Sequence, residues 1–262
     1  MTAVEADGGL RDTGEIRLTD LMHAELTKIR TLPATWIVLA VTLVANTALG
    51  FLAATDVVRV AGQGGPVAIA QLGTLLLAPV YAFIAVPVFA AGSEYGGGQL
   101  RVSLTAVPNR HRFFLAKLLA SSGVAVLAAV PAVLPGHLVQ HVAAPRGDSG
   151  VGSVISGFLA LVMAYLLVGL VGFGFAVLAK TVVTPLAVLF ILPVLVSPML
   201  GGILPGVVRL LPHEATLSFL AMPTSPALAL GGATGLAVVT AWAVVFVGTA
   251  WWVNARRDTS GS

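Results

Sequence analysis

The chain has 262 residues, of which 57% are hydrophobic and 10% are charged, against roughly 45 to 50% and about 25% in soluble domains. A soluble fold of this length cannot hide that much apolar surface, so lipid is expected to be the solvent for most of the chain. The formal net charge of +3 is too small for a nucleic-acid-binding footprint, and the absence of cysteine excludes disulfides and thiol metal sites.

The N-terminal region is predicted to be a disordered cytoplasmic tail over residues 1–15, followed by an amphipathic helix over residues 16–33. The apolar face of this helix is expected to hold Leu18, Leu21, Met22, Leu26 and Ile29, and its polar face Asp20, Glu25, Lys28 and Arg30. Such a helix directly before a span favours a position in the membrane interface. A solvated lead-in helix is the alternative.

Six uncharged apolar stretches, each near the ~20 residues that a spanning helix needs, follow within residues 34–253. They cover residues 34–54, 67–91, 118–139, 154–179, 182–204 and 227–253. We therefore predict an all-α, polytopic membrane protein with a single domain of about six spans and a cytoplasmic tail over residues 254–262.

The distribution of Lys and Arg predicts the orientation of these spans, because cytoplasmic loops carry an excess of both residues. With both termini inside, eleven basic residues are cytoplasmic and three, Arg59, Arg146 and Arg209, are outside. The inner set is Arg11, Arg17, Lys28, Arg30, Arg101, Arg110, Arg112, Lys117, Lys180, Arg256 and Arg257. Trp36, Trp251 and Trp252 then fall at the inner boundary, where amphipathic rings prefer to lie.

The segment over residues 204–226 mixes apolar residues with Arg209, His213 and Glu214. Half-apolar backbone is tolerated at membrane depth only where protein or a wet cavity satisfies it. This pattern predicts a re-entrant or interfacial outer element, with an ordinary outer loop lying on the headgroups as the alternative.

The sequence contains none of the usual machinery for energy conversion. The spans hold no ionisable residue away from their ends, although ion-coupled carriers usually need one. The GxxxxGK[ST] phosphate loop is also absent. If the protein moves something uphill, the energy is expected to enter through a partner, and we assign no catalytic, cofactor-binding or metal-binding residue to this chain.

Two weaker motifs are interpreted as structural. Gly147 to Gly150 read Gly-Asp-Ser-Gly, which can hold a nucleophilic serine, but it is also ordinary turn composition and no later span supplies a histidine as base. His137 and His141 are spaced for one helix face, yet the third ligand that a metal requires is not evident.

The most distinctive polar segment is the long inner loop over residues 92–117, which begins with an acid directly after the second span. Leu100, Leu104 and Val107 recur at helical spacing before the Pro108-Asn109 break, which predicts a short helix against the inner face.

The order of residues in this loop resembles the inner loop of ABC-2 type transporter permeases. The resemblance rests on Glu94, then Gly98, Gln99, Leu100 and Arg101, then Leu104, Thr105, Val107 and Pro108, then Arg110 and Lys117. The entry helix, six spans and bulky outer segment are similar to the same family, so the resemblance covers nearly the whole chain. At Gly96 and Gly97 the family more often has bulkier polar or basic residues.

The resemblance implies a permease subunit of an ATP-driven exporter in the plasma membrane of a prokaryote. Two such halves, identical or related, would associate in the lipid bilayer with two subunits that bind ATP, and the inner loop would couple the ATPase to the spans. The coupling residues would be Glu94, Tyr95, Gly98, Gln99, Leu100, Arg101, Leu104, Thr105, Pro108 and Arg110. The alternative is a membrane scaffold or regulatory subunit that translocates nothing.

Polar residues and prolines within the spans mark two further features. Thr42 and Asn46 share a helix face and are candidates either for lining a path or for contacting another helix. Prolines in the second and fifth spans are expected to bend those helices.

Overall fold

The computed structural model describes residues 17–55, 57–62, 65–95, 109–143, 150–222 and 224–256. Within them, six helical segments are long and apolar enough to cross a membrane, so the predicted all-α, multi-pass architecture is confirmed at that level. These segments are Pro33–Thr55, Gly73–Tyr95, Arg110–Val142, Val151–Ala179, Val183–Leu200 and Gly232–Arg256.

The first span is a single helix, and the second is broken. Helix α1 (Leu18–Thr31) precedes α2 (Pro33–Thr55), which starts at a proline, a residue well suited to the first helical position. The second span comprises α3 (Gly73–Leu77), α4 (Pro79–Phe83), α5 (Ala85–Gly92) and the 3-10 turn η2 (Ser93–Tyr95). Pro79 and Pro87 lack the backbone N–H that a continuous helix would use, which accounts for breaks in this span.

The third and fourth spans are the longest helices, α7 (Arg110–Ala143) and α8 (Val151–Ala179). Helix α7 begins eight residues before the apolar stretch predicted from residue 118. The reason is local, because the side chain of Asn109 accepts a hydrogen bond of 3.1 Å from the backbone N–H of Arg112 and caps the helix.

The fifth span contains α9 (Val183–Ile191), a π-helical turn η3 (Leu192–Val196) and α10 (Ser197–Leu200). The sixth is α13 (Gly232–Arg256). Between them lie two short helices, α11 (Pro205–Val208) and α12 (Pro212–Phe219). Helix α12 is buried from Pro212 to Ser218 and packs against α13, α8 and α3. Other helices of the same chain therefore cover the middle of the segment predicted as an outer element.

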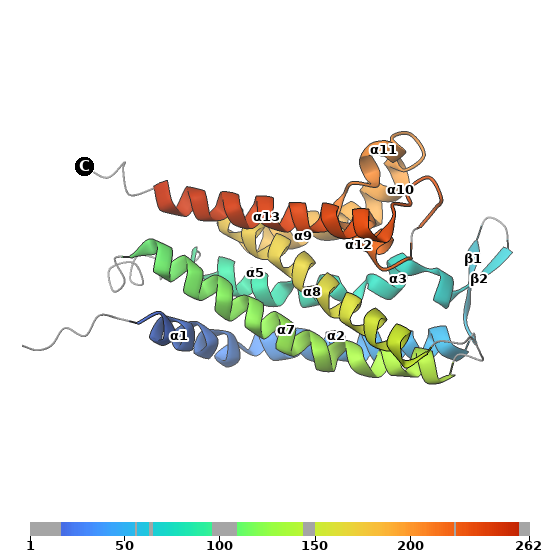
Figure 1. Cartoon of the computed structure of the whole chain (residues 1–262), viewed down its shortest axis with the longest axis horizontal. Helices are drawn as coiled ribbons and strands as arrows, with labels where there is room; N and C mark the ends of the chain where they lie inside the picture. The colour runs from blue at the N-terminus through green and yellow to red at the C-terminus, as the bar shows by residue number, and fades with distance from the viewer. Residues whose placement is uncertain are drawn as a thin grey trace, which may run out of the picture.

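A small antiparallel hairpin of β1 (Arg59–Gly62) and β2 (Gly65–Ala68), followed by the 3-10 turn η1 (Ile69–Gln71), joins the first two spans. The sequence had indicated only a connection there. The hairpin, α10 and α11 lie at one end of the helical bundle, whereas α1 and the C-terminal end of α13 lie at the other (Figure 1).

These two ends of the bundle differ in charge. We call the end with α1 the basic end, and the opposite end, with β1 and β2, the hairpin end. The basic end carries Lys28, Arg30, Arg110, Arg112, Lys117, Lys180 and Arg256. Both described ends of the chain therefore lie on the more basic side of the molecule.

The core follows α8, which packs against α13, α5 and α7. Tyr165 and Phe173 of α8 are fully buried, and Phe83 of α4 meets the Tyr165 ring edge to face at 5.0 Å. Glycines allow the closest approach, because a Cβ added to Gly174 would lie 2.5 Å from the backbone of Phe246 in α13.

Candidate functional site: a buried charge cluster at the basic end

Four charged side chains meet at the basic end and form what we call the charge cluster: Glu25, Lys28, Glu94 and Lys117. Glu25 and Lys28 come from α1, Glu94 from η2 at the end of the second span, and Lys117 from the second turn of α7. The side chains of Glu25, Glu94 and Lys117 are only 4%, 4% and 6% exposed. Charges this deeply buried require partners.

Each carboxylate of the cluster contacts both lysines. Lys28 Nζ lies 2.7 Å from Glu25 Oε1 and 2.6 Å from Glu94 Oε1. Lys117 Nζ lies 2.9 Å from Glu25 Oε2 and 3.0 Å from Glu94 Oε1, and it also donates to the carbonyl of Ala90 at 3.1 Å. Two positive and two negative charges thus form a closed ring without net charge.

Helix α1 supplies this cluster because Glu25 does not lie on its solvated face. Leu21, Glu25 and Ile29 form its buried stripe at four-residue spacing, which corrects the prediction that placed Glu25 opposite the apolar residues. Leu21 packs with Phe113 and Ala116 of α7. The carboxylate can occupy this stripe because Lys117 of the same helix α7 neutralises it.

The ring of Phe113 completes the surroundings of the two lysines. Lys117 Nζ lies 5.3 Å and Lys28 Nζ 6.0 Å from the centroid of this ring, within the range of cation–π attraction. The contacts within the cluster change the pKa of Lys28, whose side chain is half exposed. Burial alone would lower the pKa of Lys28, but its hydrogen bonds to Glu25 and Glu94 outweigh this effect and raise it above the ordinary value.

One carboxylate oxygen of the cluster lacks a hydrogen-bond donor among the described residues. Glu94 Oε2 is buried and has no hydrogen-bond partner among the described residues. Beside it lies a cavity of about 190 Å³, lined by residues of α1 and α5 and by the hydroxyls of Thr35 and Ser93. The cluster therefore retains an acceptor next to the point where the inner loop leaves the second span.

The cluster also joins the two ends of that loop. Glu94 lies at the end of the second span, and Lys117 lies in α7, the helix of the third span. The salt bridge of 3.0 Å between them therefore connects the two spans that flank the loop. Of the predicted coupling residues, Glu94 is at the centre of the cluster, while Tyr95 and Arg110 are partly exposed beside the loop. The remaining ones, Gly98, Gln99, Leu100, Arg101, Leu104, Thr105 and Pro108, lie outside the described residues.

The polar residues predicted in the first span lie elsewhere, in the middle of the bundle. Asn46 and Tyr165 exchange hydrogen bonds of 2.9 and 3.0 Å between α2 and α8. Thr42 is fully buried and donates to the backbone carbonyl of Val38 one turn earlier. Asn46 therefore contacts another helix, whereas the hydrogen bond of Thr42 stays within α2.

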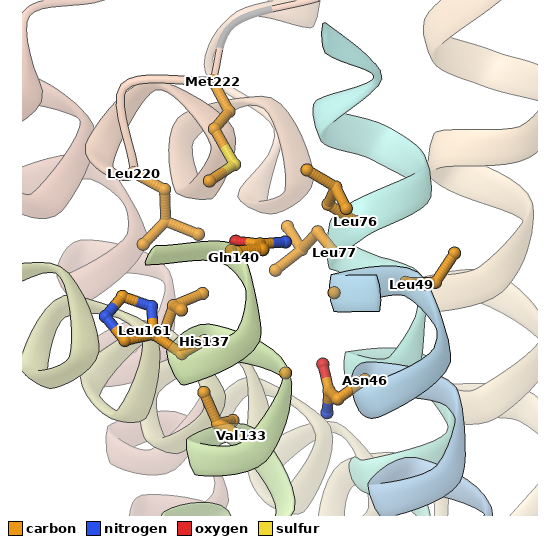
Figure 2. A pocket seen from close by; sticks show the side chains of 12 residues that line it. Asn46, Leu49, Leu76, Leu77, Val133, His137, Gln140, Leu161, Leu220 and Met222 are labelled. Atoms are coloured by element: carbon orange, nitrogen blue, oxygen red, sulfur yellow. The ribbon is translucent and has the colours of Figure 1, made fainter. Parts of the chain in front are cut away.

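Figure 2 shows the cavity beside Asn46, which is lined by side chains from α2, α3, α7 and α8 and by Leu220 and Met222 after α12. Its volume is about 30 Å³, which is room for one water molecule. A passage for cargo would have to open by movement of these helices.

Of the two motifs interpreted as structural, only the histidine pair lies within the described residues. His137 Nε2 bonds to the carbonyl of Val154, and His141 Nδ1 to the carbonyl of His137. Within the described ranges no group of three or more His, Asp or Glu residues is arranged to hold a metal ion. Ser149 lies outside these ranges.

Sequence reasoning singled out Glu94 but missed the partnership of Glu25, Lys28 and Lys117. The available signal was Lys117, a charge one turn inside a long apolar helix, because such a residue needs a buried counter-ion.

No protein-family model matches the chain, and no match was found among curated proteins.

Proposed function

We propose that this chain is the membrane-spanning subunit of an ATP-driven exporter that resembles the ABC-2 type permeases. The observation that carries the proposal is the charge cluster, because it ties α1, the second span and the third span together at the root of the inner loop. The sequence of that loop supplied the resemblance, and the cluster adds a physical way for the loop to act on the spans.

In this proposal both ends of the inner loop are joined at the charge cluster, so a force on the loop reaches the second and third spans together. A partner that presses on the loop displaces Glu94 and, through the salt bridge to Lys117, α7 as well. Helix α1 moves with them because Glu25 and Lys28 complete the ring. The three elements then move together, since separating any one of them leaves a buried charge without its partner.

The proposed assembly contains two permease halves, alike or related, and two ATPase subunits that bind and hydrolyse ATP. The basic end is cytoplasmic, in agreement with the excess of Lys and Arg there, and the membrane is the prokaryotic plasma membrane. In the proposed mechanism this chain forms the path, and its helices separate around the small cavity beside Asn46 during transport.

Purification of the full chain from the membrane of its source cell in a mild detergent tests the proposed partnership. We expect a protein with a phosphate loop to co-purify, and charge reversal in Glu94→Lys or Arg101→Glu to alter its ATPase rate. Recovery of the chain without any such ATPase would contradict the proposal. An ATPase that co-purifies but is indifferent to both reversals would favour the scaffold or regulatory alternative.

A further inference from the structure

A second polar cavity lies at the hairpin end, far from the charge cluster. It has a volume of about 310 Å³ and lies between α10, α12 and the turn that leads to α13. Pro193, Pro198 and Leu228 supply apolar walls, whereas Glu214, Ser197 and Thr224 supply oxygen atoms. The volume is in the range of roughly 300 to 1,000 Å³ that small-molecule sites occupy.

Glu214 is the only charged side chain among the described residues that line this cavity, and it is 2% exposed. Its Oε2 accepts a hydrogen bond of 2.9 Å from the hydroxyl of Thr224. Among the described residues it forms no salt bridge, in contrast to the glutamates of the charge cluster. A buried carboxylate in this position favours a positively charged partner.

The neighbouring histidine does not supply that charge. His213 Nδ1 is hydrogen-bonded to the hydroxyl of Tyr81, and burial lowers the pKa of His213 to about 4. The imidazole is therefore neutral near neutral pH. No Lys, Arg or His side chain among the described residues that line the cavity faces Glu214.

Ser197 provides a second observation at the same cavity. Its side chain is buried, and its Oγ has no hydrogen-bond partner among the described residues. The residue directly follows the π-helical turn η3, a type of distortion that occurs frequently at functional sites. An unsatisfied hydroxyl and a buried glutamate without a salt bridge to any described residue thus line the same cavity.

From this geometry we propose that the cavity binds the ammonium group of a small organic amine with an apolar body. The N–H groups would donate to Glu214, Ser197 and Thr224, and the apolar body would lie against Pro193, Pro198 and Leu228. The described lining supplies a single carboxylate and a largely apolar wall, whereas Ca²⁺ sites are built from several carboxylate and carbonyl oxygens, which favours an amine over that ion. The inference does not depend on the proposed transport function, because binding needs no ATPase.

The test measures equilibrium binding of two fluorescent probes to the purified full chain in lipid nanodiscs, with empty nanodiscs as blanks. Dansylcadaverine carries a primary ammonium group, and N-butyl dansylamide is its uncharged counterpart. We expect saturable binding of the amine at least tenfold tighter than that of the neutral probe, as for hydrogen bonds to a charged group. Equal binding of the two probes, or displacement of the amine by millimolar Na⁺ or Ca²⁺, would overturn the proposal.

Variants locate the binding. Glu214→Gln should remove the preference for the amine, and Ser197→Ala, which leaves the charge in place, should weaken binding of the amine about fivefold. Asp20→Asn makes the matched carboxyl-to-amide change on an exposed residue of α1 and should leave binding unchanged. Full amine binding by Glu214→Gln would contradict the proposal. If that variant does not fold, unchanged binding by Ser197→Ala contradicts it instead.

Discussion

Lys117 is the residue on which the charge cluster depends most, because it is 6% exposed in its side chain and faces two carboxylates. Replacement by Met keeps most of the volume but leaves Glu25 and Glu94 opposite a single lysine. We expect Lys117→Met to lower the free energy of unfolding by about 3 kcal/mol or more, since it leaves a buried charge without its partner. Unfolding of the purified protein by heat or by SDS in mixed micelles measures this.

The controls for this prediction separate charge balance from lost packing. Adding Glu94→Gln to Lys117→Met restores an equal number of positive and negative charges and should recover part of the loss. Arg209→Gln removes a positive charge from an exposed position at the hairpin end and should change stability by no more than about 0.5 kcal/mol. Equal stability of Lys117→Met and Arg209→Gln would mean that the cluster does not hold the basic end together.

At the scale of elements, the crossing of α2 and α7 depends on two glycines in contact. A Cβ added to Gly136 would lie 2.2 Å from the carbonyl oxygen of Asn46, and one added to Gly50 would lie 2.4 Å from that of Gly136. Gly136→Ala must therefore push the helices apart, at a cost of about 1 to 3 kcal/mol. Gly123→Ala is the matched control, because its Cβ would meet open space in the same helix and should stabilise α7 by up to about 1 kcal/mol. The same unfolding measurement compares the two, and a similar effect of both would contradict this packing.

Helix α12 is expected to be sensitive to acid because it buries His213 in the neutral form. The pKa of His213 is lowered to about 4, against about 6.5 when exposed, so the opened element binds the proton more readily than the folded one. Stability is therefore full above pH 6.5 and falls as the pH drops toward 4, by about 3 kcal/mol at pH 4.

Hydrogen exchange of the α12 amides, corrected for the intrinsic effect of pH, measures this opening. We expect exchange to accelerate below pH 6 in the wild-type protein and to show a weaker pH dependence in His213→Gln. A variant that retains the full acid sensitivity would show that another group is responsible.

The sequence predicted the helices better than it predicted their ends and contacts. Hydropathy is a local property, so six apolar stretches were enough to indicate six spans, and prolines predicted bends in the second and fifth spans, where the helices are interrupted. The hairpin at Arg59–Ala68 and the early start of α7 depend on strand pairing and on the Asn109 cap, which apolar content does not encode. The burial of α12 likewise depends on its neighbours in space.

The charge cluster could be predicted only in part for the same reason. An acid after the second span drew attention to Glu94, but Glu25 and Lys117 are 92 residues apart in sequence. The charge of Glu25 led to the prediction of the solvated face, although its four-residue spacing from Leu21 and Ile29 places it on the face that packs on α7. Lys117 within an apolar helix signals locally that a counter-ion is needed, but a single sequence does not say which residue supplies it.

For the whole molecule, the proposed orientation puts the basic end and the hairpin end on opposite sides of the membrane. The chain contains no cysteine, so single cysteines can be introduced without removing native ones. Thr19→Cys at the basic end and Gln71→Cys at the hairpin end both change exposed residues. With a membrane-impermeant maleimide we expect intact cells to label Gln71→Cys, and Thr19→Cys to react only after permeabilisation. Labelling of both in intact cells would contradict the predicted topology.

The most direct test of the central claim is the ATPase rate of the chain reconstituted in lipid vesicles with its co-purified ATPase. The claim is that force reaches the spans through the charge cluster. We predict that Glu94→Lys changes that rate at least severalfold while the ATPase stays bound, and that Arg209→Gln leaves it unchanged. Indistinguishable rates for wild type, Glu94→Lys and Arg209→Gln would contradict the claim.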